Sequence, residues 1–315
     1  MSSSSTSDAL DRQAGLGATS AGTARLPSPA ELAGTRSAPG FWRRLLRSRL
    51  NVVCLAYVIT VGSVALLAPT LAPYSPNAQD LANTLAPLFS DGHPLGTDDL
   101  GRDVLSRLIY AARVSVMAPF IAVGVSAILG VPFGLLTGYL GGALDWVVSR
   151  IADALIALPA LVLALALVGV FDPSLVNAMV AVGVAYSPRL LRIVRAATLA
   201  AREETYVEAS RVVGCSTPRL LLMHILPNVR SPLLVQLSLL MGIALLAEAS
   251  LSFLGMGVQP PEASWGSMLR TAFDNNFAAP WLAWFPGLAI VATVLAFNLL
   301  GDGIRDAVGL ERGRQ

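Results

Sequence analysis

The chain has 315 residues, of which 54% are hydrophobic and only 13% are charged. Soluble domains carry about 25% charged residues, so this composition excludes an ordinary soluble protein and indicates a chain embedded largely in lipid. All 22 basic residues are arginine, and the net charge is +2. The arginines lie in short clusters between apolar runs, a pattern that is typical of membrane topology and argues against a nucleic-acid partner.

Residues 1–40 are rich in Ser, Ala, Gly, Thr and Pro. A segment with so few large apolar side chains cannot bury enough surface to fold alone, so we expect a disordered cytoplasmic tail. This tail has no apolar run after a charged start, so it is not expected to act as a signal peptide.

The first apolar run, about 52–71, directly follows Arg43, Arg44, Arg47 and Arg49. Its length of about 20 residues is sufficient to cross ~30 Å of hydrocarbon. Basic residues in front of a first span hold that end in the cytoplasm, so we expect the run to leave the cytoplasm here.

Five more runs of comparable character follow, at about 114–136, 151–170, 175–188, 232–254 and 281–300. The uncharged part of the fourth run is short. We expect its helix to continue into Arg189, Arg192 and Arg195, with these side chains snorkelling to the interface. The sequence therefore predicts an all-α membrane protein with six transmembrane helices.

The arginines also predict the orientation of the spans. Eighteen of the 22 fall on the proposed inner side, and the exceptions are Arg102, Arg107, Arg113 and Arg270. Cytoplasmic loops carry an excess of arginine, so we expect both termini in the cytoplasm.

Gly134 and Gly138 form a G-x-x-x-G pattern in the second run. Small residues let helices approach closely, either between two chains or within one. Both alternatives stay open here, and close packing within the chain is preferred because chance matches are common in apolar runs.

The segment 202–228, between the fourth and fifth runs, is too polar to enter lipid. Its first part predicts a short helix over about 200–213, ended by Gly214, since glycine readily takes the left-handed conformation after a helix. A helix–turn–helix fixed to spans at both ends can pass motion from a cytoplasmic partner to the membrane helices.

The second half of this segment predicts another short helix. Ser216 or Thr217 supplies the N-cap, and Pro218 takes the first helical position. Pro227 is expected to end the helix.

This segment also contains a spaced set of motif positions: Glu208, Ala209, Ser210, Gly214, Leu226 and Pro227. The set resembles the EAA loop of ABC importer permeases, which docks in a groove of the ATP-binding subunit. Two positions depart from the family pattern, because Ser210 replaces the second alanine and His224 takes the isoleucine position. The His variant is similar to the dipeptide, oligopeptide and nickel permease branch.

Segments 93–107, 251–266 and 297–306 resemble further motifs of the same branch, in the same order. The resemblance covers about 41–310 and indicates the second, C-type permease of the pair. It implies a type I ABC importer permease fold.

From this resemblance we expect three parts of the chain. They are a tail (1–40), an N-terminal permease segment with the first span (41–110), and a core permease domain (111–310). The core domain has five spans and the coupling loop 199–231.

The resemblance also implies partners. Six spans make half of a pore, so a second, homologous permease would form a heterodimer with this chain. Two ATP-binding subunits and an extracytoplasmic solute-binding protein would complete the importer in the lipid of the cytoplasmic membrane. The branch favours di- and oligopeptides as substrates, and nickel or another small solute is the alternative.

Catalysis by this chain is not expected. Because the chain has no lysine, it has no G-x-x-x-x-G-K-[ST] loop, and ATP hydrolysis must come from another polypeptide. Two His and two Cys without ligand spacing predict no metal site and no cofactor. Asp98, Asp99 and Asp103 lie among glycines, so turn and capping chemistry explains them better than an active site.

Glu248 interrupts the fifth apolar run. A charged side chain at a helix centre costs ~2.5–3.5 kcal/mol on insertion scales, so it needs a special environment. Two roles stay open, a place in the translocation path and a buried structural hydrogen bond. A stand-alone secondary transporter would require such intramembrane charges for ion coupling, and it is the alternative from another class.

Overall fold

The computed structural model describes residues 41–312, with side chains described for 43–307. The expected tail, 1–40, lies outside the described residues. From Phe41 onward the chain forms one unit of helices and turns. The expected boundary between residues 110 and 111 falls inside a continuous helix, α6, and the division into two permease parts stays a prediction.

The helices of the first half begin at the basic segment. They are α3 (Phe41–Leu45), α4 (Arg49–Leu66), α5 (Ala68–Leu71), α6 (Val104–Leu140), α7 (Gly142–Ile156) and α8 (Ala160–Val170). The helices of the second half are α9 (Leu175–Arg202), α10 (Thr205–Val212), α11 (Thr217–Leu220), α12 (Leu226–Phe253), α13 (Trp265–Asp274) and α14 (Trp284–Arg312).

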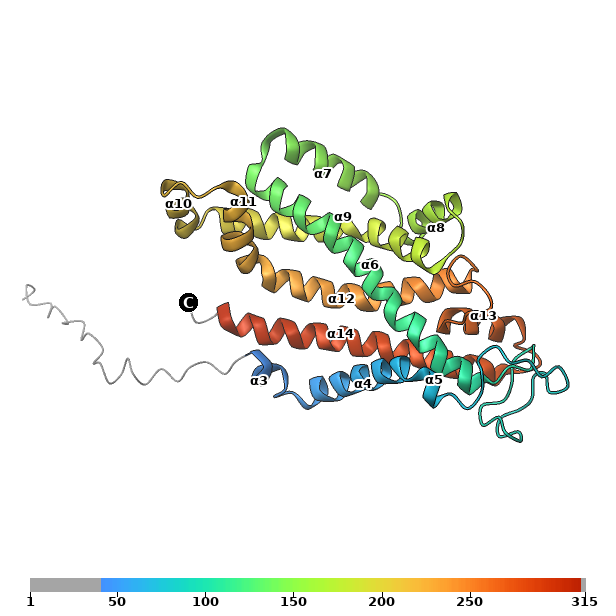
Figure 1. Ribbon diagram of the computed structural model, residues 1–315. Coiled ribbons are helices and arrows are strands. Elements are labelled where there is room, and N and C mark those ends of the chain that lie inside the picture. The colour runs from blue at the N-terminus through green and yellow to red at the C-terminus, as the bar shows by residue number, and fades with distance from the viewer. Residues whose placement is uncertain (1–40, 313–315) are drawn as a thin grey trace, which may run out of the picture. The chain divides into compact units, whose positions relative to one another are not determined.

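Figure 1 shows α4, α6, α9, α12 and α14 running alongside one another. Helices α10 and α11 lie at one end of this bundle. Helix α13 and the loop between α5 and α6 lie at the opposite end. The bundle thus separates the two long polar segments of the chain, as a membrane-spanning topology requires.

Four helical segments of the described residues are long and apolar enough to cross a membrane: Arg49–Leu66, Val104–Leu140, Thr217–Phe253 and Pro280–Ala307. A fifth is added if the bent pair α7–α8 counts as one span. Helix α9 is not among them, because its second half carries several arginines. Its continuation past Arg189 as one helix is confirmed.

The expected span over 151–170 is not one continuous helix. Helices α7 and α8 meet at a bend of 93°. Pro159 precedes α8 directly, and it has no N–H to bond to the preceding turn and restricts Leu158 as well. The helix therefore breaks, and α8 packs against α9 in a new direction.

Ion pairs fasten α7 to α9, and the expectation that the arginines of α9 snorkel to the interface stays a prediction. The Arg195 guanidinium donates from Nε and Nη2 to the two oxygens of Asp145, at 2.5 and 2.6 Å. Arg192 of α9 forms a second ion pair with α7, to Asp153. Because the arginines have partners from a neighbouring helix, they do not have to reach the interface individually.

Glycines bring α6 and α9 into close contact. A Cβ atom added at Gly130, Gly134 or Gly138 would lie 2.7–2.9 Å from the Cβ of a residue on α9. Without a hydrophobic driving force in lipid, such close packing is what holds helices together. The prediction that the G-x-x-x-G pattern serves close packing within the chain is confirmed.

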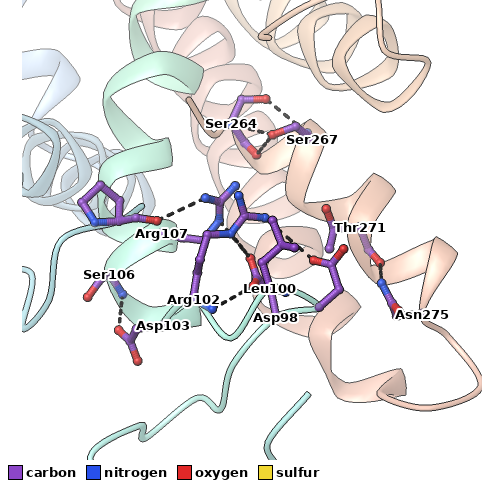
Figure 2. A network of polar contacts seen from close by, with 12 residues as sticks. Asp98, Leu100, Arg102, Asp103, Ser106, Arg107, Ser264, Ser267, Thr271 and Asn275 are labelled. Carbon is purple, nitrogen blue, oxygen red and sulfur yellow. Dashed lines mark hydrogen bonds and ion pairs between the residues drawn. The ribbon is translucent and has the colours of Figure 1, made fainter. Parts of the chain in front are cut away.

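The acidic residues before α6 organise the loop that leads into it (Figure 2). Asp98 is buried and accepts the N–H groups of Leu100 and Arg102 at 3.0 and 2.9 Å. Its other oxygen accepts from the Arg102 Nε at 2.7 Å and lies 3.4 Å from the Arg107 Nε. The prediction of turn and capping chemistry is therefore confirmed.

Asp103 is the N-cap of α6. Its Oδ2 accepts the Ser106 N–H at 2.7 Å, and its Oδ1 lies 2.8 Å from the His93 Nδ1. We expect Asp103→Ala to lower the free energy of unfolding by roughly 0.5–2 kcal/mol, because it removes the cap and leaves His93 without its carboxylate. Thermal unfolding of the detergent-purified protein measures this effect. Asp91→Ala, at an exposed loop carboxylate, is the control, and equal midpoints for the two variants would contradict the capping role.

Candidate functional site

In the segment between α9 and α12, the first helix begins later than predicted. The first helix was expected over 200–213, but α9 ends at Arg202 and α10 begins only at Thr205. The break turns α10 so that Val207 is fully buried in a cluster with Leu220 and Ile225. Burial of this valine explains an interruption that helix propensity does not predict.

Gly214 ends α10 as predicted. Its φ is +82°, its N–H bonds to the Arg211 carbonyl at 2.9 Å, and the Cys215 N–H bonds to the Ser210 carbonyl at 3.0 Å. These two bonds form a Schellman motif, in which a non-glycine residue would be strained.

The second helix of the segment does not end at Pro227, so this prediction is wrong. Helix α11 continues through a π-helical turn, Leu221–Ile225, into α12. A π-helical turn widens the helix by one residue, and it accommodates a proline that cannot form the usual backbone bond. The polar segment is thus continuous with the span that follows.

Ser216 occupies the N-cap position of α11, but its side chain makes no capping hydrogen bond, and Pro218 lies in the first helical turn. The residue types predicted the start of the helix correctly and the capping bond incorrectly.

The motif positions fall on two parts of this segment. Glu208, Ala209 and Gly214 are exposed on or directly after α10, and Ser210 is half-buried. Leu226 and Pro227 form the first turn of α12, where Leu226 packs against the cluster around Val207 and Pro227 is exposed. Within the described side chains, 43–307, the Glu208 carboxylate has no hydrogen-bond or ion-pair partner.

Several large apolar side chains of this segment are exposed, among charged ones such as Arg211 and Arg219. Val212 and Val213 are 83% and 87% exposed, and Leu222 and Met223 are 60% and 67% exposed. Beside them lies an open groove of about 500 Å³, lined by Ala209, Ser210, Val213, Gly214, Cys215, Arg219 and His224. Exposed apolar side chains around a free carboxylate, on a segment too polar for lipid, are suited to contact with another protein.

Glu248 lies far from this surface, in a buried junction of three helices. Its Oε1 accepts from the Ser252 hydroxyl at 2.7 Å, and its Oε2 lies 3.4 Å from the Ser115 hydroxyl of α6. Ser115 accepts the Trp265 N–H of α13 at 3.1 Å. This geometry matches the structural hydrogen bond considered from the sequence, and a role in the translocation path stays a prediction.

Four residues around α10 were missed by sequence reasoning: Tyr139, Tyr206, Arg211 and Asn228. Their contacts join positions 22 or 72 residues apart, so no local pattern reports them. Across the described residues, no group of three His, Cys, Asp or Glu side chains is placed to hold a metal ion.

Two protein families match the chain. The family described as the binding-protein-dependent transport system inner membrane component matches residues 130–310, more than half of the chain. The chain belongs to this family. The N-terminal TM domain of oligopeptide transport permease C matches residues 40–87. The chain is therefore an OppC-type permease component of an ABC transporter, a multi-pass protein of the inner membrane whose ATPase is on separate subunits.

Curated relatives agree with this assignment. The dipeptide transport system permease protein DppC of Escherichia coli K12 is 46% identical over 273 residues, which cover 85% of this chain and 91% of that protein. DppC of Haemophilus influenzae is 42% identical over 273 residues, covering 85% and 92%. The glutathione transport system permease protein GsiD of Pectobacterium atrosepticum is 41% identical over 268 residues, covering 85% and 89%.

Solved structures show the same fold. Inward-facing conformations of the MetNI methionine ABC transporter align with a TM-score of 0.54 at 19% sequence identity, covering 64% of this chain and 95% of that chain. A second crystal form aligns with a TM-score of 0.53 at 20% identity. The likeness establishes an ABC transporter permease fold for this part of the chain.

Proposed function

We propose that this chain is the C-type permease subunit of an importer that moves di- and oligopeptides across the cytoplasmic membrane. The relatives named above transport dipeptides or glutathione, itself a short peptide. Nickel is the alternative that the sequence left open. The observation that carries the proposal is the exposed segment around Glu208, with its exposed apolar side chains, on a chain of the binding-protein-dependent family.

The proposed topology has six spans, with α7–α8 as a broken third span and α9 as the fourth. Ion pairs from α7 support the presence of Arg192 and Arg195 in such a helix. Both termini are proposed to be cytoplasmic. In support, Arg44 of α3 donates to the Ala307 carbonyl of α14 at 3.3 Å, and α3 lies at the same end of the bundle as α10 (Figure 1).

The proposed assembly pairs this chain with a second, homologous permease, two ATP-binding subunits and an extracytoplasmic solute-binding protein. The ATP-binding subunits would dock on the Glu208 surface, with Glu208, Ala209, Ser210, Gly214, Leu226 and Pro227 as the coupling residues. Closure of those subunits on ATP would then move α10 and the helices joined to it.

Uptake measurements test this function. The chain is expressed with the subunits encoded beside it, in cells that lack their own peptide importers, and uptake of a labelled dipeptide and of labelled nickel is followed. Dipeptide uptake that needs both the binding protein and an active ATPase is expected. Nickel uptake alone would favour the alternative substrate, and uptake that persists with an inactivated ATPase would indicate a secondary transporter instead.

A further inference from the structure

Helix α10 contacts the rest of the chain through the apolar side chain of Val207, through the ring of Tyr206, and through polar contacts of Tyr206 and Arg211. Val207 is fully buried, and Tyr206 and Arg211 lie on either side of it around the helix, about 140° apart at 100° per residue. Glu208 and Val212 point to the opposite, exposed side. The apolar contacts of Val207 and Tyr206 are not directional, so the polar contacts of Tyr206 and Arg211 decide whether α10 moves alone or carries its neighbours.

Tyr206 connects α10 to α12. Its hydroxyl accepts from the Asn228 Nδ2 at 2.7 Å and donates to the His224 carbonyl at 3.5 Å. The Asn228 Nδ2 also donates to that carbonyl, at 2.9 Å. Burial raises the pKa of the Tyr206 hydroxyl above its ordinary value, which already keeps a tyrosine protonated at neutral pH. This contact reaches the π-helical turn and the first turn of α12.

Arg211 connects α10 to α6. Its Nε donates to the Tyr139 hydroxyl at 3.0 Å, and its Cζ lies 4.8 Å from the centre of the Tyr139 ring. Such a cation–π contact adds to the hydrogen bond and fixes the guanidinium over the ring. Tyr139 is one residue from the end of α6, and its carbonyl also accepts from Arg202 at 3.3 Å.

The two helices reached in this way are also joined at a distant point. Ser115 of α6 and Glu248 of α12 meet in the buried junction described above. A displacement of α10 that pulls on both helices therefore acts on a pair that is already connected.

We propose that Tyr206 and Arg211 are positioning residues that transmit the movement of α10 to α12 and α6. The contacts Tyr206–Asn228 and Arg211–Tyr139 are called the α10 clamp below. This inference rests on the proposed function, because it assumes that an ATPase moves α10. Neither residue is one of the six motif positions, and both polar side chains contact residues of this chain, so their role is separable from docking by measuring whether the ATP-binding subunits stay bound.

The test uses the complete importer in lipid vesicles and measures dipeptides transported per ATP hydrolysed. Tyr206→Phe and Arg211→Gln each remove one polar contact of the clamp. We expect each to lower this ratio by roughly three- to tenfold, as the loss of one hydrogen bond would, while the ATP-binding subunits remain bound. Arg211→Lys keeps the charge over the Tyr139 ring and is expected to restore part of the ratio.

Two matched controls lie at the opposite end of α6. Tyr110→Phe and Arg113→Gln make the same chemical changes at side chains that have no polar partner among residues 43–307. Both should leave the ratio unchanged. In addition, Tyr139→Phe combined with Arg211→Gln should lower the ratio no more than Arg211→Gln alone, because both changes remove the same contact.

A ratio in Tyr206→Phe and Arg211→Gln equal to that of the controls would overturn the clamp. It would also be overturned if transport and ATP hydrolysis fell together, in proportion to the amount of complex that assembles, since that result indicates a structural role only. Failure of the wild-type complex to couple ATP hydrolysis to dipeptide uptake would instead contradict the proposed function.

Discussion

Replacing Gly134 with leucine is expected to prevent the normal packing of α6 on α9 and to leave little folded protein in the membrane. A Cβ atom at this position would lie 2.7 Å from the Val194 Cβ and 2.8 Å from the Leu191 carbonyl oxygen. The carbonyl belongs to the backbone and cannot rotate away. The two helices would have to separate along their shared length, which also weakens the contacts at Gly130 and Gly138.

The expected loss exceeds the ~1–3 kcal/mol typical of extra methylenes in a packed core, because the backbone itself must shift. The measurement is the yield and thermal midpoint of the detergent-purified chain. Gly124→Leu is the control, since Gly124 lies on the same helix with no atom within 4 Å of an added Cβ. Equal stability of the two variants would show that α6 and α9 are not in contact as described.

A partial rescue sharpens this test. Val194→Ala removes the Val194 Cγ1, which lies 2.9 Å from an added Cβ at Gly134, but leaves the Val194 Cβ and the Leu191 carbonyl in place. Gly134→Ala should therefore be better tolerated with Val194→Ala than without it, whereas Gly134→Leu should not recover.

Glu208→Ala is expected to abolish ATP-driven uptake while leaving the folded chain intact. The carboxylate is exposed and has no partner within the described side chains, so its removal breaks no contact inside the protein. If it accepts hydrogen bonds from the ATPase, each is worth ~1.5–3 kcal/mol, and docking should weaken by roughly ten- to a hundredfold. The neighbouring alanine and valines would remain to bind, but without the charged contact.

The measurement compares retention of the ATP-binding subunits during purification with dipeptide uptake in vesicles. Glu262→Ala, at an exposed glutamate near α13 at the other end of the bundle, is the control. If Glu208→Ala holds its ATPase and transports as the control does, the coupling assignment of this surface is wrong. The clamp variants differ from Glu208→Ala in one respect, since they should keep the ATPase bound.

Hydropathy located the four strongest spans because the free energy of transfer into lipid depends on the residues of each segment alone. The same local reasoning found Gly214, whose lack of a side chain permits φ of +82° after α10. It failed at Pro159 and Pro227. The first proline ends one helix and precedes another at 93°, while the second is accommodated by a π-helical turn. Which outcome a proline produces depends on what the adjacent turns pack against.

The residues of the candidate site also fall into those that the sequence predicted and those that only the structure shows. Motif spacing identified Glu208 and Gly214, and the structure shows both exposed. No local sequence pattern identified Tyr206 or Arg211. Their contacts are with Asn228 and Tyr139, which belong to other helices. Even the start of α10 was misplaced, since burial of Val207 sets it.

By itself, the sequence determined that the chain is a multi-pass membrane protein, and it located most of the helices. That the basic loops share one side of the membrane and that one polar segment binds another protein stay predictions. Only the tertiary structure decided which helix faces meet: Gly134 on Val194, Asp145 on Arg195, and Glu248 on Ser115. Transfer into lipid is a property of each segment, whereas a contact between residues 50 or more positions apart exists only once two helices have packed in one register.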